Sequence, residues 1–112
     1  PSRFVRAAFF QASAPKLASA EETVTEAFHI LNNFDIPVGV QFAEGQTVAD
    51  IPSATQWTIA CDLQGRRIYY RTMYNATIRC IDLNRINFRT VKYQRAALDK
   101  EKKQPIEQVV IQ

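Results

Sequence analysis

The sequence has few of the residues on which several common kinds of site depend. It contains three glycines, two cysteines and one histidine among its 112 residues. With so few glycines there is no glycine-rich phosphate-binding loop, and one histidine with two cysteines cannot complete a zinc site. We therefore expect the chain to bind neither a metal ion nor any other cofactor.

Long apolar runs are also missing. The longest purely apolar stretch, residues 7–10 (AAFF), is far shorter than the ~20 residues that a membrane-spanning helix needs. No apolar segment follows a basic start, as it would in a signal peptide. We expect no membrane partner, and because the first residue is Pro1 rather than methionine we expect a processed, engineered or partial product.

The overall composition is typical of a globular protein. Apolar residues make up 46% of the chain and charged residues 22%, which favours one domain or one piece of a larger domain. The net charge of +3 comes from 14 basic and 11 acidic residues that are dispersed along the chain. The densest basic run, residues 100–103, contains Glu101, so the charge indicates a solvated surface rather than a concentrated nucleic-acid-binding patch.

Helical spacing of apolar residues predicts a first helix over residues 2–12. Its apolar arc is wide, so we expect this helix to be largely buried. Arg3 and Arg6 interrupt the arc. Either both lie in solvent at the helix start, or one of them points into a cleft.

A second helix is predicted to begin at Ser19, which forms a capping box with Glu22. Its apolar stripe has helical spacing and comprises Val24, Ala27, Phe28, Leu31 and Phe34. Pro37 ends the segment. His29 lies beside this stripe rather than in a cluster of polar residues, and we interpret it as a helix-flank residue without a catalytic role.

Alternating side chains predict an antiparallel meander in the second half of the chain. Residues 55–63 alternate most clearly, residues 64–66 form a turn, and residues 67–74 are rich in strand-forming side chains. Further turns and loops are expected at residues 44–46 and 48–54, and further strands at residues 38–42, 77–83, 88–94 and 106–111. Residues 96–104 are polar and either helical or loose.

Cys61 and Cys80 both fall in predicted strands. We interpret them as two small buried hydrophobic residues, and the sequence leaves open whether they pair in a disulfide. Neither is a candidate nucleophile, because no motif places a base beside it.

Helices followed by strands predict an α+β fold, with the helices on one face of an antiparallel sheet. Large apolar residues lie on both faces of the predicted hairpin, for example Trp57 and Ile59 on one side and Ala60 on the other. We therefore expect the sheet to be covered on both faces. The two helices form one layer, so a second layer would come from another chain or from missing sequence. Residues 1–112 contain no repeat or linker and are treated as one unit.

Five segments, taken in order, resemble the C-terminal third of the choloylglycine hydrolase family, which includes bile salt hydrolases and penicillin V acylases. They are residues 2–9 (SRFVRAAF), 27–33 (AFHILNN) leading to 36–40 (IPVGV), 55–58 (TQWT), 69–75 (YYRTMYN) and 78–83 (IRCIDL). The resemblance implies the N-terminal nucleophile hydrolase fold, an αββα sandwich to which this chain would supply two helices and the meander. Residues 49–54 resemble the Gram-negative branch, which favours the bacterial periplasm over the cytoplasm.

The resemblance implies hydrolysis of a linear, non-peptide amide. In that family an N-terminal cysteine thiolate attacks the carbonyl, and its own α-amine acts as the base. An arginine in the Ser-Arg-Phe segment lies beside the thiolate and lowers its pKa, and this arginine corresponds to Arg3. Arg3 is therefore the expected catalytic residue, whereas Arg6 is the weaker candidate and is expected to be structural.

The sequence departs from the family pattern in one respect, because it begins with Pro1 and the N-terminal cysteine is absent from it. Cys61 and Cys80 do not replace it, since neither is N-terminal. We expect residues 1–112 to be the C-terminal portion of one such domain, inactive alone. Its expected partners are a small-molecule amide substrate, the rest of the enzyme on the same or a separate chain, and further copies in a homo-oligomer. Bile salt conjugates, penicillin V and acyl-homoserine lactones remain open as substrates.

Two other functions fit parts of the sequence. Basic, tyrosine-rich strands suit a small α+β module that binds single-stranded nucleic acid; the residues are Arg66, Arg67, Tyr69, Tyr70, Arg71, Lys92 and Tyr93. The shortage of glycine and the absence of a nucleic-acid motif count against this alternative. An N-terminal proline can also act as a general base, as in the tautomerase family, but a strand follows the proline there and a helix is predicted here.

Overall fold

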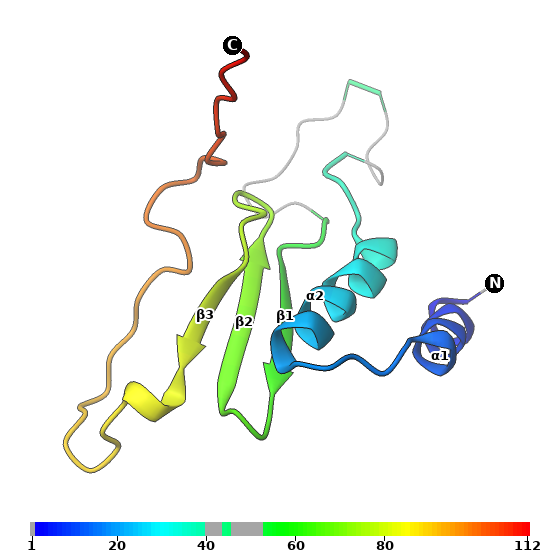
Figure 1. Ribbon diagram of the computed structural model, residues 1–112. Helices are drawn as coiled ribbons and strands as arrows, with labels where there is room; N and C mark the ends of the chain where they lie inside the picture. Colours follow the sequence, from blue (N-terminus) through cyan, green and yellow to red (C-terminus); the bar gives the residue numbers. More distant parts are fainter. Residues whose placement is uncertain (1, 40–43, 46–52) are drawn as a thin grey trace.

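The computed structural model describes residues 2–39, 44–45 and 53–112, which form two helices and one three-stranded antiparallel sheet (Figure 1). The helices are α1, Arg3–Ser13, and α2, Ala20–Leu31, which continues into a 3₁₀ turn, η1, Asn32–Phe34. The strands are β1, Trp57–Asp62, β2, Arg67–Thr72, and β3, Arg79–Asp82, followed by a second 3₁₀ turn, η2, Leu83–Arg85. The expected α+β order is confirmed.

Side-chain caps set the start of both helices. The Ser2 hydroxyl accepts a hydrogen bond from the Val5 backbone N–H at 3.3 Å, and the Ser19 hydroxyl accepts one from the Glu22 N–H at 3.1 Å. The Glu22 carboxylate in turn accepts from the N–H of Ala18 at 3.1 Å. The expected capping pair is therefore present, with Glu22 reaching back one residue further than the usual capping box.

The sheet has the order β1-β2-β3 and is antiparallel throughout. Trp57 pairs with Thr72 at one end of the first hairpin and Asp62 with Arg67 at the other. The expected hairpin is confirmed, although each strand is shorter than predicted. Beyond Thr72 the chain turns at once, because the backbone N–H and C=O groups of Thr72 and Asn75 bond to each other at 3.0 and 3.3 Å.

Gly65 in the β1–β2 turn lies in close contact with the side chain of Asp62. A Cβ atom at this position would lie 2.1 Å from a carboxylate oxygen of Asp62. That carboxylate accepts a hydrogen bond from the Gly65 N–H at 2.9 Å, and the Asn84 side chain donates to the Gly65 carbonyl at 2.8 Å. The turn that joins β1 to β2 is thus tied to η2.

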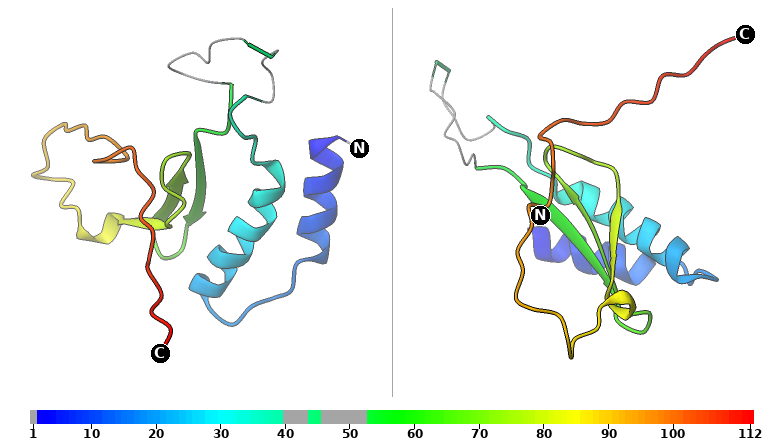
Figure 2. Two further views of the ribbon diagram at one scale, coloured as in Figure 1. Left: turned by 90° about the horizontal axis from the view of Figure 1, so that it is seen from above. Right: turned by 90° about the vertical axis from the view of Figure 1, so that its left-hand side faces the viewer.

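Both helices lie on the same side of the sheet (Figure 2). Helix α2 packs against β1, and α1 lies beside α2, away from β2 and β3 (Figure 1). The buried apolar residues of the described chain are Val24 and Phe28 of α2, which are 8% and 2% exposed. No described helix is both long enough and apolar enough to span a bilayer.

The expectation that α1 is largely buried is wrong for the described chain. None of its residues is buried, and Phe4, Val5 and Phe9 are 81%, 56% and 67% exposed. The reason is that α1 contacts α2 along one side and no described residue covers its remaining apolar arc.

The expectation of a sheet covered on both faces is also not met by the described residues. Alternation along β1 puts Thr58 and Ala60 on the face toward α2, and Trp57 and Ile59 on the opposite face. The latter two remain 56% and 46% exposed. The part of this face around Trp57 and Ile59 is therefore open, whereas Leu98 and Asp99 cover the part around Tyr70, Thr72 and Arg79.

The cysteines differ from the buried pair predicted from the sequence. Cys61 and Cys80 are both free and exposed. Cys61 lies opposite Ile68 and Cys80 opposite Tyr69, so the two side chains point to opposite faces of the sheet. They are also separated by β2, which places them about two strand spacings of ~4.8 Å apart, too far for a disulfide.

The predicted strands at residues 88–94 and 106–111 are absent. Residues 88–90 form a turn, and residues 91–112 contain no helix or strand, so residues 96–104 are loose. Val109, Val110 and Ile111 are 77%, 79% and 88% exposed. Apolar, β-branched residues form a strand only when another strand pairs with them, and no described strand does so here.

Two shorter predictions fall partly outside the described residues. Val38 and Gly39 form a turn rather than the start of a strand, and residues 40–42 of that predicted strand are not described. The turn expected at residues 44–46 is present at Glu44 and Gly45. Most of the loop expected at residues 48–54 lies outside the described chain.

Candidate functional site

Arg3 is the first residue of α1 and is exposed. It follows Ser2, whose hydroxyl caps the helix. Within the described chain, the Arg3 guanidinium makes no hydrogen bond or ion pair. A cation at a helix N-terminus opposes the helix dipole, so its own helix does not stabilise it there. Its side chain is free to reach a partner.

Arg6 lies one turn later, is half-buried and contacts two residues at the end of α2. Its Nη2 atom donates a hydrogen bond to the backbone carbonyl of Asn33 at 2.7 Å, and its guanidinium lies 5.1 Å from the centre of the Phe34 ring. Both partners belong to η1 at the end of α2. Arg6 therefore joins the first turns of α1 to the C-terminal end of the neighbouring helix.

Arg71 of β2 lies between the sheet and the C-terminal end of α2. Its guanidinium lies 5.5 Å from the centre of the Phe28 ring, and its Nη1 atom donates to the Asn32 side chain. Its Nη2 atom is buried and has no hydrogen-bond partner among the described residues. Arg71 also lines a cavity of about 130 Å³ together with Asp35 and Thr55. The alternative nucleic-acid function would need Arg71 on an exposed surface, whereas the structure packs it against Phe28.

The other residues of the predicted nucleic-acid surface do not form one surface. Tyr69 pairs with Ala60, on the face toward α2, whereas Tyr70 pairs with Ile59 on the opposite face. The Tyr70 hydroxyl donates to the Leu98 carbonyl at 3.3 Å. The tyrosines therefore cannot act as one stacking platform for successive bases.

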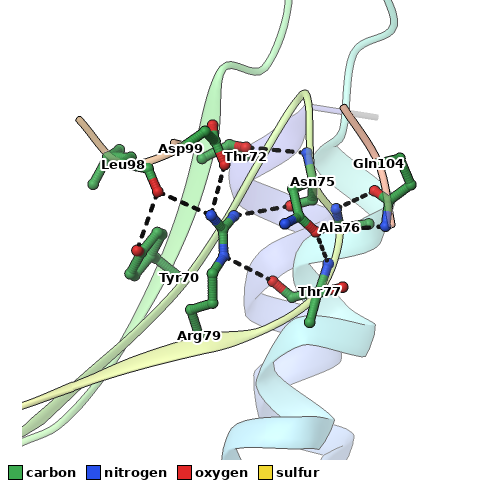
Figure 3. A network of polar contacts seen from close by, with 9 residues as sticks. All are labelled: Tyr70, Thr72, Asn75, Ala76, Thr77, Arg79, Leu98, Asp99 and Gln104. Atoms are coloured by element: carbon green, nitrogen blue, oxygen red, sulfur yellow. Dashed lines mark hydrogen bonds and ion pairs between the residues drawn. The ribbon is translucent and has the colours of Figure 1, made fainter. Parts of the chain in front are cut away.

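A polar network around Arg79 holds the C-terminal segment against the β2–β3 connection (Figure 3). The Arg79 guanidinium pairs with the Asp99 carboxylate at 2.6 Å and donates to the Leu98 carbonyl at 2.9 Å. On its other side it donates to the Asn75 carbonyl at 3.1 Å, and it lies 4.6 Å from the centre of the Tyr70 ring. This arginine joins β2, β3 and the segment that follows them.

The Asp99 carboxylate remains ionised because of this network. Partial desolvation by itself would raise the pKa of Asp99, but hydrogen bonds from Thr72 and Arg79 and the charge of Arg79 outweigh it, so that the pKa lies below the ordinary value. Gln104 adds a second attachment by accepting from the Ala76 N–H. These contacts have a structural role, because they hold the C-terminal segment against β2 and the β2–β3 connection.

Asp82 has a similar role at the other end of β3. Hydrogen bonds from the side chain and the backbone N–H of Asn84, followed by the charges of Arg67 and Arg85, hold the pKa of Asp82 below its ordinary value. The nearest atoms of the two arginines lie 3.5 and 3.9 Å from this carboxylate. These contacts also explain the start of η2, where Asp82 is the capping residue.

Cys80, Tyr69 and His29 do not form a nucleophile and base suited to catalysis. Cys80 is exposed and hydrogen-bonded to Tyr69. Partial burial raises the pKa of the Tyr69 hydroxyl, and Cys80 raises it further, so the hydroxyl stays protonated at neutral pH and cannot act as a base. His29 is exposed and lies 3.6 Å from Glu26 on the same helix. The described residues also contain no group of three potential metal ligands from His, Cys, Asp and Glu.

Comparison with known proteins gives consistent results. The family model described as linear amide C-N hydrolases, choloylglycine hydrolase family, matches residues 1–102. A bile salt hydrolase/transferase of Clostridium perfringens is 33% identical over 99 residues, covering 84% of this chain and 29% of the relative. Another, from Lactiplantibacillus plantarum, is 32% identical over 84 residues, covering 74% of this chain and 24% of the relative.

A solved structure extends the likeness to the fold. The crystal structure of a mutant conjugated bile acid hydrolase from Clostridium perfringens matches with a TM-score of 0.64 and 25% identity, over 95% of this chain and 29% of that one. The chain thus spans less than a third of the length of these relatives. The helices and the antiparallel sheet agree with the expected N-terminal nucleophile hydrolase fold, in which they form one part. The chain belongs to the choloylglycine hydrolase family of linear amide C-N hydrolases.

Proposed function

We propose that residues 1–112 are the C-terminal portion of a single choloylglycine hydrolase-like domain. The family match over residues 1–102 and the 29% share of the first relative support this proposal. The open apolar surfaces support it independently, since Phe4 and Phe9 on α1 and Trp57 on the sheet are more than half exposed. Apolar faces of this kind become stable when another layer of the same domain covers them.

The domain is proposed to hydrolyse a linear amide with an N-terminal cysteine that this chain lacks. The thiolate forms a bond to the amide carbonyl carbon, and the C–N bond breaks as the leaving amine takes a proton from the cysteine α-ammonium group. Water then attacks the thioester, which releases the carboxylic acid and restores the thiol. Cys61 and Cys80 have no part in these steps.

Arg3 is proposed as the catalytic residue contributed by this chain. The single observation that carries the proposal is its unpaired, exposed guanidinium at the first residue of α1, within the segment that the family model covers. Beside a thiolate, this charge lowers the pKa of the cysteine and stabilises the attacking form. The chain alone, without the cysteine, is proposed to be inactive.

The proposed substrates are small-molecule amides. The names of the relatives direct the first assays to conjugated bile salts, and penicillin V and acyl-homoserine lactones complete the panel. The proposed protein partners are the remainder of the domain, on the same or a separate chain, and further copies in a homo-oligomer.

The test is turnover of Arg3→Ala in the protein that contains both this chain and the N-terminal cysteine. We expect turnover to fall by about 100-fold or more, as when a single group that stabilises charge in a transition state is removed, with an unchanged circular dichroism spectrum. Arg85→Ala is the matched control, because the Arg85 side chain is 87% exposed and its Nε atom lies 3.9 Å from the nearest carboxylate oxygen of Asp82. Wild-type turnover by Arg3→Ala would refute the role of Arg3.

A further inference from the structure

A polar contact made by Arg6 attaches α1 to the end of α2. Phe4, Val5 and Phe9, its large apolar residues near Arg3, are all more than half exposed. Arg6, by contrast, is half-buried, and its guanidinium donates a hydrogen bond to the Asn33 carbonyl at 2.7 Å. The link joins residues 27 positions apart in the sequence.

The residues that contact Arg6, Asn33 and Phe34, are themselves fixed by hydrogen bonds. The Asn33 side chain donates to the carbonyls of His29 and Ile30 at 3.3 and 3.1 Å, so Asn33 closes the last turn of α2. Next to it, the Phe34 carbonyl accepts from the Thr55 hydroxyl at 3.4 Å. Contact with Arg6 therefore ties α1 to the end of α2 and to the segment that leads into β1.

We propose that Arg6 is a positioning residue for Arg3: by fixing the first turns of α1 on η1, it determines where the Arg3 guanidinium lies. This inference rests on the proposed catalytic role of Arg3. The two arginines are three residues apart, which on an α-helix is about 4.5 Å along the axis. A sliding or turning of α1 that breaks the Arg6 contacts therefore displaces Arg3 as well, and a misplacement of about 1 Å can cost on the order of 10²-fold in rate.

The two contacts of Arg6 explain why an arginine suits this position. Its planar guanidinium donates a hydrogen bond to the Asn33 carbonyl, and the Cζ atom of the same group lies over the Phe34 ring, 5.1 Å from the ring centre. A lysine can keep the charge near the ring and one hydrogen bond, though without the fixed planar geometry. A glutamine keeps a hydrogen-bond donor, but it has no charge and its side chain is shorter.

The experiment measures kcat, KM and the pH dependence of turnover for Arg6→Gln, Arg6→Lys and Phe34→Leu in the full enzyme, with a conjugated bile salt as substrate. For Arg6→Gln we expect kcat to fall about 10-fold or more with KM within about twofold, and the acidic limb of the pH profile to move to higher pH. Arg6→Lys should retain most of the kcat that Arg6→Gln loses. Phe34→Leu, which leaves Arg6 in place, should shift kcat and the pH limb in the same direction.

Arg3→Ala combined with Arg6→Gln tests whether Arg6 acts through Arg3. If it does, the double variant is no slower than Arg3→Ala. If the losses in kcat of the two single variants multiply in the double variant, Arg6 acts independently of Arg3 and the inference is overturned. The inference is also overturned if Arg6→Gln keeps the wild-type kcat and pH profile while Arg3→Ala is inactive. Both results would leave the proposed function intact. Wild-type turnover in Arg3→Ala would instead overturn the proposed function, and the positioning role with it. Arg85→Gln serves as the control for loss of a surface arginine.

Discussion

Phe28 is the residue at which the described core is most sensitive to substitution. Its side chain is 2% exposed, the lowest exposure among the buried residues of α2, and the Arg71 guanidinium lies 5.5 Å from its ring. A phenylalanine buries about 150 Å² or more, which at ~25 cal/mol per Å² amounts to about 4 kcal/mol. Substitution of buried phenylalanine by alanine costs about 3–5 kcal/mol in other proteins. We expect Phe28→Ala to lower the free energy of unfolding by about 4 kcal/mol.

Phe28→Leu separates the ring from the volume that it fills. Leucine keeps most of the apolar volume and loses the contact of the ring with Arg71, so we expect a cost of about 1–1.5 kcal/mol. Phe9→Ala is the matched control, because the same atoms are removed from a side chain that is 67% exposed. Its cost in this chain should stay within about 0.5 kcal/mol.

Urea denaturation, followed by far-UV circular dichroism and by the fluorescence of Trp57, the single tryptophan, measures these differences. With a urea dependence of about 2 kcal/mol per molar, Phe28→Ala should lower the midpoint by about 2 M. A loss below about 1.5 kcal/mol for Phe28→Ala, or equal losses for Phe28→Ala and Phe9→Ala, would refute the reasoning, since burial within this chain would then not determine stability.

Two further predictions concern a helix cap and a titrating ion pair. Ser19→Ala removes the acceptor for the Glu22 N–H, and we expect it to lower the free energy of unfolding by about 1 kcal/mol in the same urea experiment, with Ser53→Ala, an exposed serine outside the helices and strands, as control. Because the folded-state pKa of Asp99 lies below the ordinary value of 3.8, the stabilisation from its ionised form is fully present above that value and is lost as the pH falls below it. The difference in thermal midpoint between wild type and Asp99→Asn should therefore be present at about pH 6 and shrink as the pH falls below the ordinary carboxyl value; a difference that is independent of pH would contradict the ionised pairing with Arg79.

The resemblance, rather than any local pattern, pointed to Arg3 as the candidate catalytic residue. A lone arginine on an apolar helix is compatible with either a solvated or an inward role, and the described chain gives Arg3 no partner. The contacts of Arg6 were not visible in the sequence, because its partners in η1 lie 27 and 28 positions away. Similarly, the inward position of Arg71 follows from the alternation along β2, but its contact with Phe28 depends on the packing of α2 on the sheet.

The sequence by itself determined the local features of this protein. Ser19 and Glu22 set the start of α2, and the alternation around Gly65 set the β1–β2 hairpin, because these depend on neighbours a few residues away. Tertiary structure decided which apolar residues are buried. The wide apolar arc of α1 and the β-branched residues 109–111 looked equally suited to a core, yet both are exposed, since burial and strand pairing need partners that the local sequence does not specify.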